Sequence, residues 1–68
     1  QLTRREKEVL QLIVEGLTSK QIGQQLYIAE STVDTHRRNI IAKTGVANSK
    51  ALSKYAYENR LLSNVMSN

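Results

Sequence analysis

The residues that first suggest chemistry are a serine, an aspartate and a histidine within one short segment: Ser31, Asp34 and His36. These are the residue types of a nucleophile, an orienting acid and a base. Because they lie so close together on one expected helix, their side chains point in different directions and cannot align for catalysis. The chain has one histidine and no cysteine, so it offers no thiolate or histidine cluster for a metal. We therefore expect no enzyme activity, no metal and no cofactor.

The same segment predicts an amphipathic helix over about residues 30–44. Its buried stripe, at helical spacing, is expected to comprise Val33, Arg37, Ile40 and Thr44, flanked by His36 and Ile41. Glu30 lies in its first turn and Lys43 in its last. Gly45 follows at a position suited to a left-handed C-terminal cap.

The outward side of this helix carries short polar and basic groups. They are Ser31, Thr35, Arg38 and Ala42, bordered by Asp34 and Asn39. Small side chains allow a close approach to another surface, and the basic ones favour an anionic surface. DNA meets both conditions, because its major groove admits an α-helix and its base edges offer hydrogen-bond partners. The alternative is a solvated amphipathic helix with scattered charges.

Length and charge agree with a small module that binds a polyanion. The chain has 68 residues, a formal charge of +4 and a pI near 9.8. It has no apolar run of membrane-spanning length and no leader-like segment, so we expect a cytoplasmic protein without a membrane partner. Because the chain begins with Gln1 rather than Met, we expect it to be a fragment of a longer protein or a processed chain.

Further helices are expected to position this segment. Thr3 and Glu6 form a capping box that starts a helix over about residues 4–15, and Gly16 ends it. A second box at Thr18 starts a short helix. The residues that follow give the pattern of a helix-turn-helix. Ile22 and Leu26 are apolar anchors, and Gly23 is the small residue where the helices cross. Ile28 is the apolar turn residue, and Val33 is the anchor on the next helix.

A fourth helix is expected after an N-cap at Asn48, from Ser49 to Glu58. Its inner arc is predicted to comprise Leu52, Tyr55, Ala56 and Asn59, with Leu61 and Leu62 closing the core. We expect one domain over residues 1–62 and a frayed tail over residues 63–68. The predicted fold class is all-α, a four-helix bundle that contains a helix-turn-helix.

Several spaced motifs together resemble the LuxR-type helix-turn-helix family, which includes the output domains of NarL/FixJ-like response regulators. The matching residues are Leu2, Thr3, Arg5, Glu6, Glu8, Val9 and Leu10; Gly16, Leu17, Thr18, Lys20 and Ile22; Glu30, Ser31, Thr32 and Val33; and His36, Lys43, Gly45 and Val46. The resemblance implies a helix-turn-helix at about residues 19–38, a transcriptional role and dimeric binding to paired half-sites. It also suggests a receiver or sensory domain before this segment, with RNA polymerase as a further candidate partner.

Four positions depart from the family pattern. Gly23 replaces the usual alanine and keeps the small residue. Ala29 replaces a serine or threonine N-cap, which removes about 1 kcal/mol of capping or transfers it to Ser31. Thr44 replaces leucine or methionine and thins the core, and Ser49 replaces arginine.

Two groups of residues are predicted to contact DNA. The predicted base-reading residues are Asp34, Thr35, Arg38 and Asn39. The predicted phosphate-contacting residues are Lys20, Ser31, Thr32, His36, Arg37 and Lys43. Three of these residues each have an alternative role. Arg38 could instead pair with Asp34, and His36 could instead pack in the core. Asp34 could instead moderate affinity by repelling phosphate.

The outward side of the fourth helix is the predicted dimer surface, formed by Lys50, Ser53, Lys54 and Tyr57, since its inner side belongs to the core. The two lysines repel across a two-fold axis, so we expect pairing on DNA only. The alternative function is a helical protein-interaction module, such as an adaptor or anti-sigma-like domain, that uses the same basic face.

Overall fold

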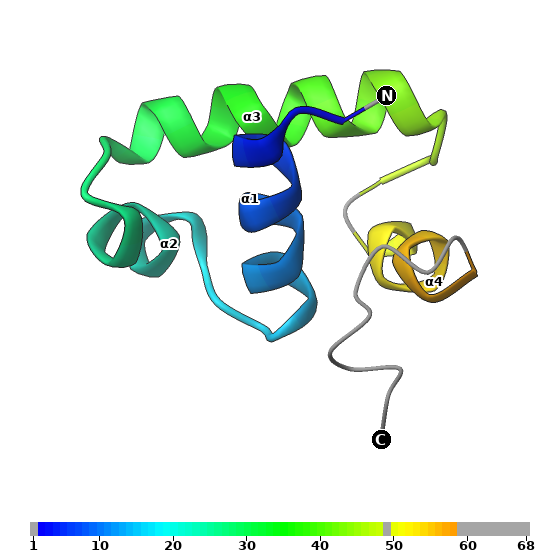
Figure 1. Cartoon of the computed structure of the whole chain (residues 1–68), viewed down its shortest axis with the longest axis horizontal. Coiled ribbons are helices and arrows are strands. Elements are labelled where there is room, and N and C mark those ends of the chain that lie inside the picture. The colour runs from blue at the N-terminus through cyan, green and yellow to red at the C-terminus, as the bar shows by residue number, and fades with distance from the viewer. Residues whose placement is uncertain (1, 49, 59–68) are drawn as a thin grey trace.

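The computed structural model describes residues 2–48 and 50–58, and in these residues the regular structure is helical throughout (Figure 1). α1 spans Arg4–Val14, α2 Ser19–Leu26, α3 Glu30–Thr44 and α4 Ala51–Glu58. α3 is the longest helix and runs along the top of the view, with α1 and α2 beneath it and α4 below its C-terminal end. The predicted all-α class is confirmed.

Both predicted capping boxes are present. The Glu6 backbone N–H donates to Thr3 Oγ1 at 3.1 Å, and the Thr3 N–H donates to Glu6 Oε1 at 2.9 Å. At the start of α2, Thr18 and Gln21 exchange the same two bonds, at 2.8 and 3.2 Å. Each box satisfies two N–H groups that a helix leaves unpaired, so both helices begin at the residue after the threonine.

α1 ends one residue earlier than predicted, at Val14, and Gly16 stops it as expected. Gly16 adopts a left-handed φ of 96°. Its N–H donates to the Ile13 carbonyl, and the Leu17 N–H donates to the Leu12 carbonyl. This pair of bonds is the Schellman motif, and it turns the chain directly into the second capping box.

One apolar cluster joins the four helices. Its buried members are Val9, Leu10, Leu12, Ile22, Val33, Ile40, Leu52 and Ala56. Fully burying a side chain of leucine or isoleucine size contributes about 1.5–3 kcal/mol, so this cluster is the main attractive contribution in a small domain. It holds α3 by one side and leaves the other side exposed.

α4 begins at Ala51, two residues later than predicted. Asn48 Oδ1 accepts from the Ala51 N–H at 3.2 Å, so the predicted cap is used. Leu52 and Ala56 face the core, and Tyr55 is half-buried. The expectations for Ser49, Asn59, Leu61, Leu62 and the tail over residues 63–68 lie outside the described residues.

Candidate nucleic-acid interface

A tight turn connects α2 to α3 and fixes the angle between them. Tyr27 adopts a left-handed conformation, with φ 61° and ψ 42°, and the Ile28 N–H donates to the Gly23 carbonyl at 3.0 Å. A Cβ atom on Gly23 would lie 2.7 Å from the Ile28 carbonyl oxygen and 3.5 Å from the Glu30 nitrogen. We expected the body of the next helix as the neighbour of Gly23. The neighbour is instead the backbone of the turn that leads into it.

A side-chain hydrogen bond fastens the start of α2 to α3. Ser19 Oγ donates to Asp34 Oδ1 at 2.7 Å, and both side chains are half-buried. Asp34 therefore has a positioning role that the sequence pattern did not indicate. The alternative pairing of Arg38 with Asp34 is not found among the ion pairs of the described residues.

The outward face of α3 is hydrogen-bonded within itself. Thr35 Oγ1 donates to the Ser31 carbonyl at 3.1 Å and accepts from Arg38 Nη2 at 3.4 Å. Ser31, Thr32, Thr35, Arg38 and Asn39 are all exposed. The Arg38 guanidinium thus lies against Thr35, and most of its donors remain available to a partner.

The opposite side of α3 holds the packed residues. Val33 and Ile40 are fully buried, as predicted. Arg37 and His36 are half-buried, and His36 Nδ1 is buried without a hydrogen-bond partner in the part of the chain that the structure describes. This placement agrees with the packing alternative for His36. Thr44 is half-buried, and its hydroxyl donates to the Ile41 carbonyl at 3.4 Å.

The first turn of α3 lacks a side-chain cap, as expected for Ala29 at the N-cap. Within the described residues, the Ser31 side chain does not take over that cap. Backbone bonds from Thr32 and Val33 to the Ala29 carbonyl close the first turn instead.

The last turn of α3 is fastened to α1 by an ion pair. Lys43 Nζ donates to the two carboxylate oxygens of Glu6 at 2.9 and 3.2 Å, and Glu6 is only 3% exposed. The Thr3 backbone N–H, together with Lys43, lowers the pKa of Glu6 against the opposing effect of burial. We predicted Lys43 as a phosphate contact, but its ammonium group is engaged with Glu6.

The remaining predicted contacts lie on other helices. Lys20 is exposed in the first turn of α2. Lys50, in the turn before α4, is exposed, as are Lys54 and Tyr57 on α4, and Ser53 is half-buried. Lys54 Nζ lies 4.0 Å from Glu58 Oε2. The predicted dimer surface is therefore accessible to a second copy.

Neither a membrane span nor a metal cluster is found among the described residues. No helix there has the length and apolar character to cross a bilayer. No group of three or more histidine, cysteine, aspartate or glutamate side chains lies together as metal ligands require.

A short helix, a left-handed turn and a longer helix with an exposed polar face, packed on a supporting helix, define a helix-turn-helix domain. The chain belongs to the luxR family of bacterial regulatory proteins, because the family model described as "Bacterial regulatory proteins, luxR family" matches residues 1–56. The domain is accordingly a DNA-binding module of transcription regulation and not an enzyme. The predicted family membership is confirmed.

Curated relatives resemble the chain over most of its length. It is 46% identical over 61 residues to the transcriptional regulatory protein LiaR of Bacillus subtilis, which covers 90% of this chain and 29% of LiaR. It is 39% identical over 64 residues to the transcriptional regulatory protein MctR of Rhizobium johnstonii, a match that covers 94% of this chain and 30% of MctR. It is 48% identical over 56 residues to the uncharacterized response regulatory protein YgeK of Escherichia coli, a match that covers 82% of this chain and 38% of YgeK. The chain thus spans about a third of the length of these relatives.

Proposed function

We propose that this domain is the output domain of a bacterial response regulator and that it reads duplex DNA with α3 in the major groove. The observation that carries the proposal is the exposed polar and basic face of α3 on a helix whose other side is fixed to the core. The groove admits one helix, and its base edges match the donors and acceptors of that face. The names of LiaR, MctR and YgeK support the regulatory role.

Within α3 we assign base contacts to Thr35, Arg38 and Asn39, because all three are exposed. Arginine pairs in a bidentate manner with guanine, and asparagine with adenine. Asp34 joins this group most readily through its second carboxylate oxygen, since Oδ1 already accepts from Ser19.

Phosphate contacts fall to exposed groups near the ends of the helix-turn-helix. Lys20, Ser31 and Thr32 are exposed and suited to this role. Arg37 is half-buried, and its long side chain is able to reach a phosphate from the edge of the core. Lys43 and His36 are less suited, because the first is paired with Glu6 and the second is half-buried. We propose that these two mainly orient α3.

The experiment is a binding-site selection from a random duplex pool, followed by titration of the selected site at two salt concentrations. Arg38→Ala and Thr35→Ala are expected to weaken specific binding by about 1–3 kcal/mol where a base contact is lost. Arg5→Ala removes the same charge as Arg38→Ala, but from α1, and serves as the control. Equal affinities for the native domain and both α3 variants would remove α3 as the reader, and binding without salt dependence would favour the protein-interaction alternative.

We further propose that two copies bind DNA about a two-fold axis through Lys50, Ser53, Lys54 and Tyr57. One recognition helix reads few base pairs, and paired half-sites double the contacts. Tyr57 is 41% exposed and is the large apolar group of this surface. Tyr57→Ala should reduce cooperativity on a paired site more than affinity for one half-site. Unchanged cooperativity would show that α4 does not form the interface.

For the whole protein we propose a cytoplasmic regulator with a receiver or sensory domain outside this segment. The proposal is supported by the relatives, because this chain matches only about a third of the length of each of them. Dimerisation driven by that domain and contact with RNA polymerase are further proposals. Sequencing the complete gene and assaying transcription with purified polymerase test them.

A further inference from the structure

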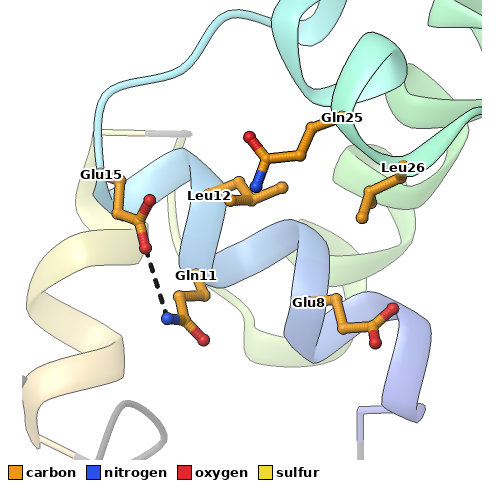
Figure 2. Close-up of a pocket in the computed structure, with 6 residues that line it drawn as sticks. All are labelled: Glu8, Gln11, Leu12, Glu15, Gln25 and Leu26. Carbon is orange, nitrogen blue, oxygen red and sulfur yellow. Dashed lines mark hydrogen bonds between the residues drawn. The ribbon is translucent and has the colours of Figure 1, made fainter. Parts of the chain in front are cut away.

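A groove runs between α1 and α2, on the part of the molecule that α3 does not line (Figure 2). Its volume is about 260 Å³, and it is lined by Glu8, Gln11, Leu12, Glu15, Gln25 and Leu26. Leu12 and Leu26 form its apolar floor. Figure 2 shows Gln25 extending from α2 toward Leu12 on α1, with the two glutamates at the ends of the lined stretch of α1.

The charges at this groove have the opposite sign from the chain as a whole. The chain carries +4, yet both charged residues that line the groove are glutamates. Glu8 on α1 and Glu15, the C-cap residue of α1, lie seven residues apart, which places them about 10.5 Å apart along the helix axis. The groove therefore presents two carboxylates on either side of an apolar floor.

The interactions that these two carboxylates already make are exposed and weak. Arg5 Nη1 lies 3.4 Å from Glu8 Oε1, with both side chains 44% exposed. Gln11 Nε2 donates to Glu15 Oε2 at 3.3 Å in an exposed position. Exposed pairs of this kind contribute about 0–1 kcal/mol, so a better-placed cation can replace them.

The groove remains accessible when α3 contacts DNA. α1 and α2 lie beneath α3 in Figure 1 and contact its buried side. The exposed face of α3 points the other way. Two carboxylates also repel phosphate, so DNA itself is an unsuitable occupant. The volume falls below the roughly 300–1,000 Å³ of small-molecule sites, which leaves a protein side chain as the better fit.

We propose that this groove docks a basic amphipathic helix of a partner protein. One or two leucine-sized side chains of that helix cover Leu12 and Leu26, and lysine or arginine residues seven positions apart meet Glu8 and Glu15. The matched spacing follows because both partners are helices with the same rise per residue. The domain would then hold DNA with one side and a protein with the other.

The test uses a synthetic helical peptide as the probe. It carries two lysines seven residues apart, with leucines three and four residues after the first lysine, so that all four side chains lie on one face of the helix. A peptide of the same composition in scrambled order is the control. We expect the ordered peptide to shift the NMR signals of the Leu12 and Leu26 methyl groups, and the scrambled peptide to leave them unchanged. Equal shifts with both peptides, or no binding, would overturn the proposal.

A charge exchange separates the groove from general electrostatics. The double variant Glu8→Lys with Glu15→Lys should bind the lysine peptide at least tenfold more weakly than the native domain. The same variant should bind a peptide that has glutamates in place of the lysines. Glu30→Lys with Glu58→Lys makes the same change in net charge away from the groove. Equal weakening in both double variants contradicts the proposal. If the lysine double variant does not fold, Glu8→Gln with Glu15→Gln replaces it. This variant should bind the lysine peptide several-fold more weakly than the native domain.

A competition with DNA completes the test. The ordered peptide should bind equally well to the free domain and to the domain saturated with its selected duplex. Displacement by the duplex would place the peptide on α3 and contradict the groove assignment. DNA affinity of the glutamine pair is measured in parallel, so that a failure of DNA binding is distinguished from a failure of the groove.

Discussion

Lys43 Nζ, in the last turn of α3, lies 2.9 Å from Oε1 of Glu6, a carboxylate buried in the first turn of α1. The same oxygen accepts from the Thr3 backbone N–H, so the pair also supports the start of α1. The Glu6 side chain is 4% exposed, whereas the Lys43 side chain is 38% exposed. The cost of burial therefore falls mainly on the glutamate, and Lys43 compensates for it.

Lys43→Met is expected to lower the free energy of unfolding by about 1–3 kcal/mol, because it leaves a buried carboxylate without its cation. The measurement is urea denaturation followed by circular dichroism. Lys20→Met is the matched control, since Lys20 is exposed and its loss should change stability by about 0.5 kcal/mol or less. Equal stabilities for the two variants would show that the pair contributes nothing to the fold.

The Glu6 carboxylate should also make stability depend on pH. Its pKa is lowered in the folded chain, so its stabilising contribution is present above the ordinary glutamate pKa of 4.5. That contribution is lost as the pH falls through the lowered pKa. We expect the melting temperature of the native domain to fall below about pH 4.5 more steeply than that of Glu6→Gln. Parallel curves from pH 7 to pH 2 would assign the acid sensitivity to other groups.

Gly23→Ala should destabilise the domain even though alanine is the better helix former by about 1 kcal/mol. The new Cβ would lie 2.7 Å from the Ile28 carbonyl oxygen, and that atom belongs to the backbone of the turn. Overpacking of this kind costs about 1–3 kcal/mol. Gln24→Ala, at the next and exposed position of α2, is the control. A higher melting temperature for Gly23→Ala would mean that the turn shifts without cost.

Tyr27→Gly should stabilise the domain. Tyr27 has a positive φ of 61° and is 93% exposed, so its side chain contributes little packing while its backbone is strained. A left-handed conformation costs a residue other than glycine about 1 kcal/mol, and the greater freedom of glycine in the unfolded chain offsets part of the gain. We expect a net increase of a few tenths of a kcal/mol to about 1 kcal/mol in the free energy of unfolding. Tyr27→Ala, which keeps the strain, should show no such increase.

The fold could be predicted from the sequence where its signals are local. Thr3 with Glu6, Thr18 with Gln21, and Gly16 each act over a few residues, and the structure confirms the helix starts and the stop that they predict. The start of α4 was less clear, because Asn48 caps a turn that becomes regular helix only at Ala51.

The site was less predictable, because two of its fastenings connect distant residues. Glu6 and Lys43 are 37 residues apart, and Ser19 and Asp34 are 15 apart. Each of these side chains also has an ordinary local explanation, such as a capping box or a solvated helix surface. Helical periodicity identified the exposed face of α3, but it does not show which polar groups on that helix bind other helices.

The two fastenings of α3 act on its rotation as well as its position. Asp34 and Lys43 are nine residues apart, so the bonds to Ser19 and Glu6 lie about 13.5 Å apart along the helix axis. The buried Val33 and Ile40 already hold one side of the helix, and two further bonds at separated points restrict its rolling about the axis more than one bond would. A shift of one residue in the helix turns a side chain by about 100°, so even a partial roll would move Arg38 and Thr35 away from a base edge. Substitutions at Ser19 or Glu6, which belong to other helices, can therefore imitate the loss of a base contact by changing the angle at which α3 presents its face.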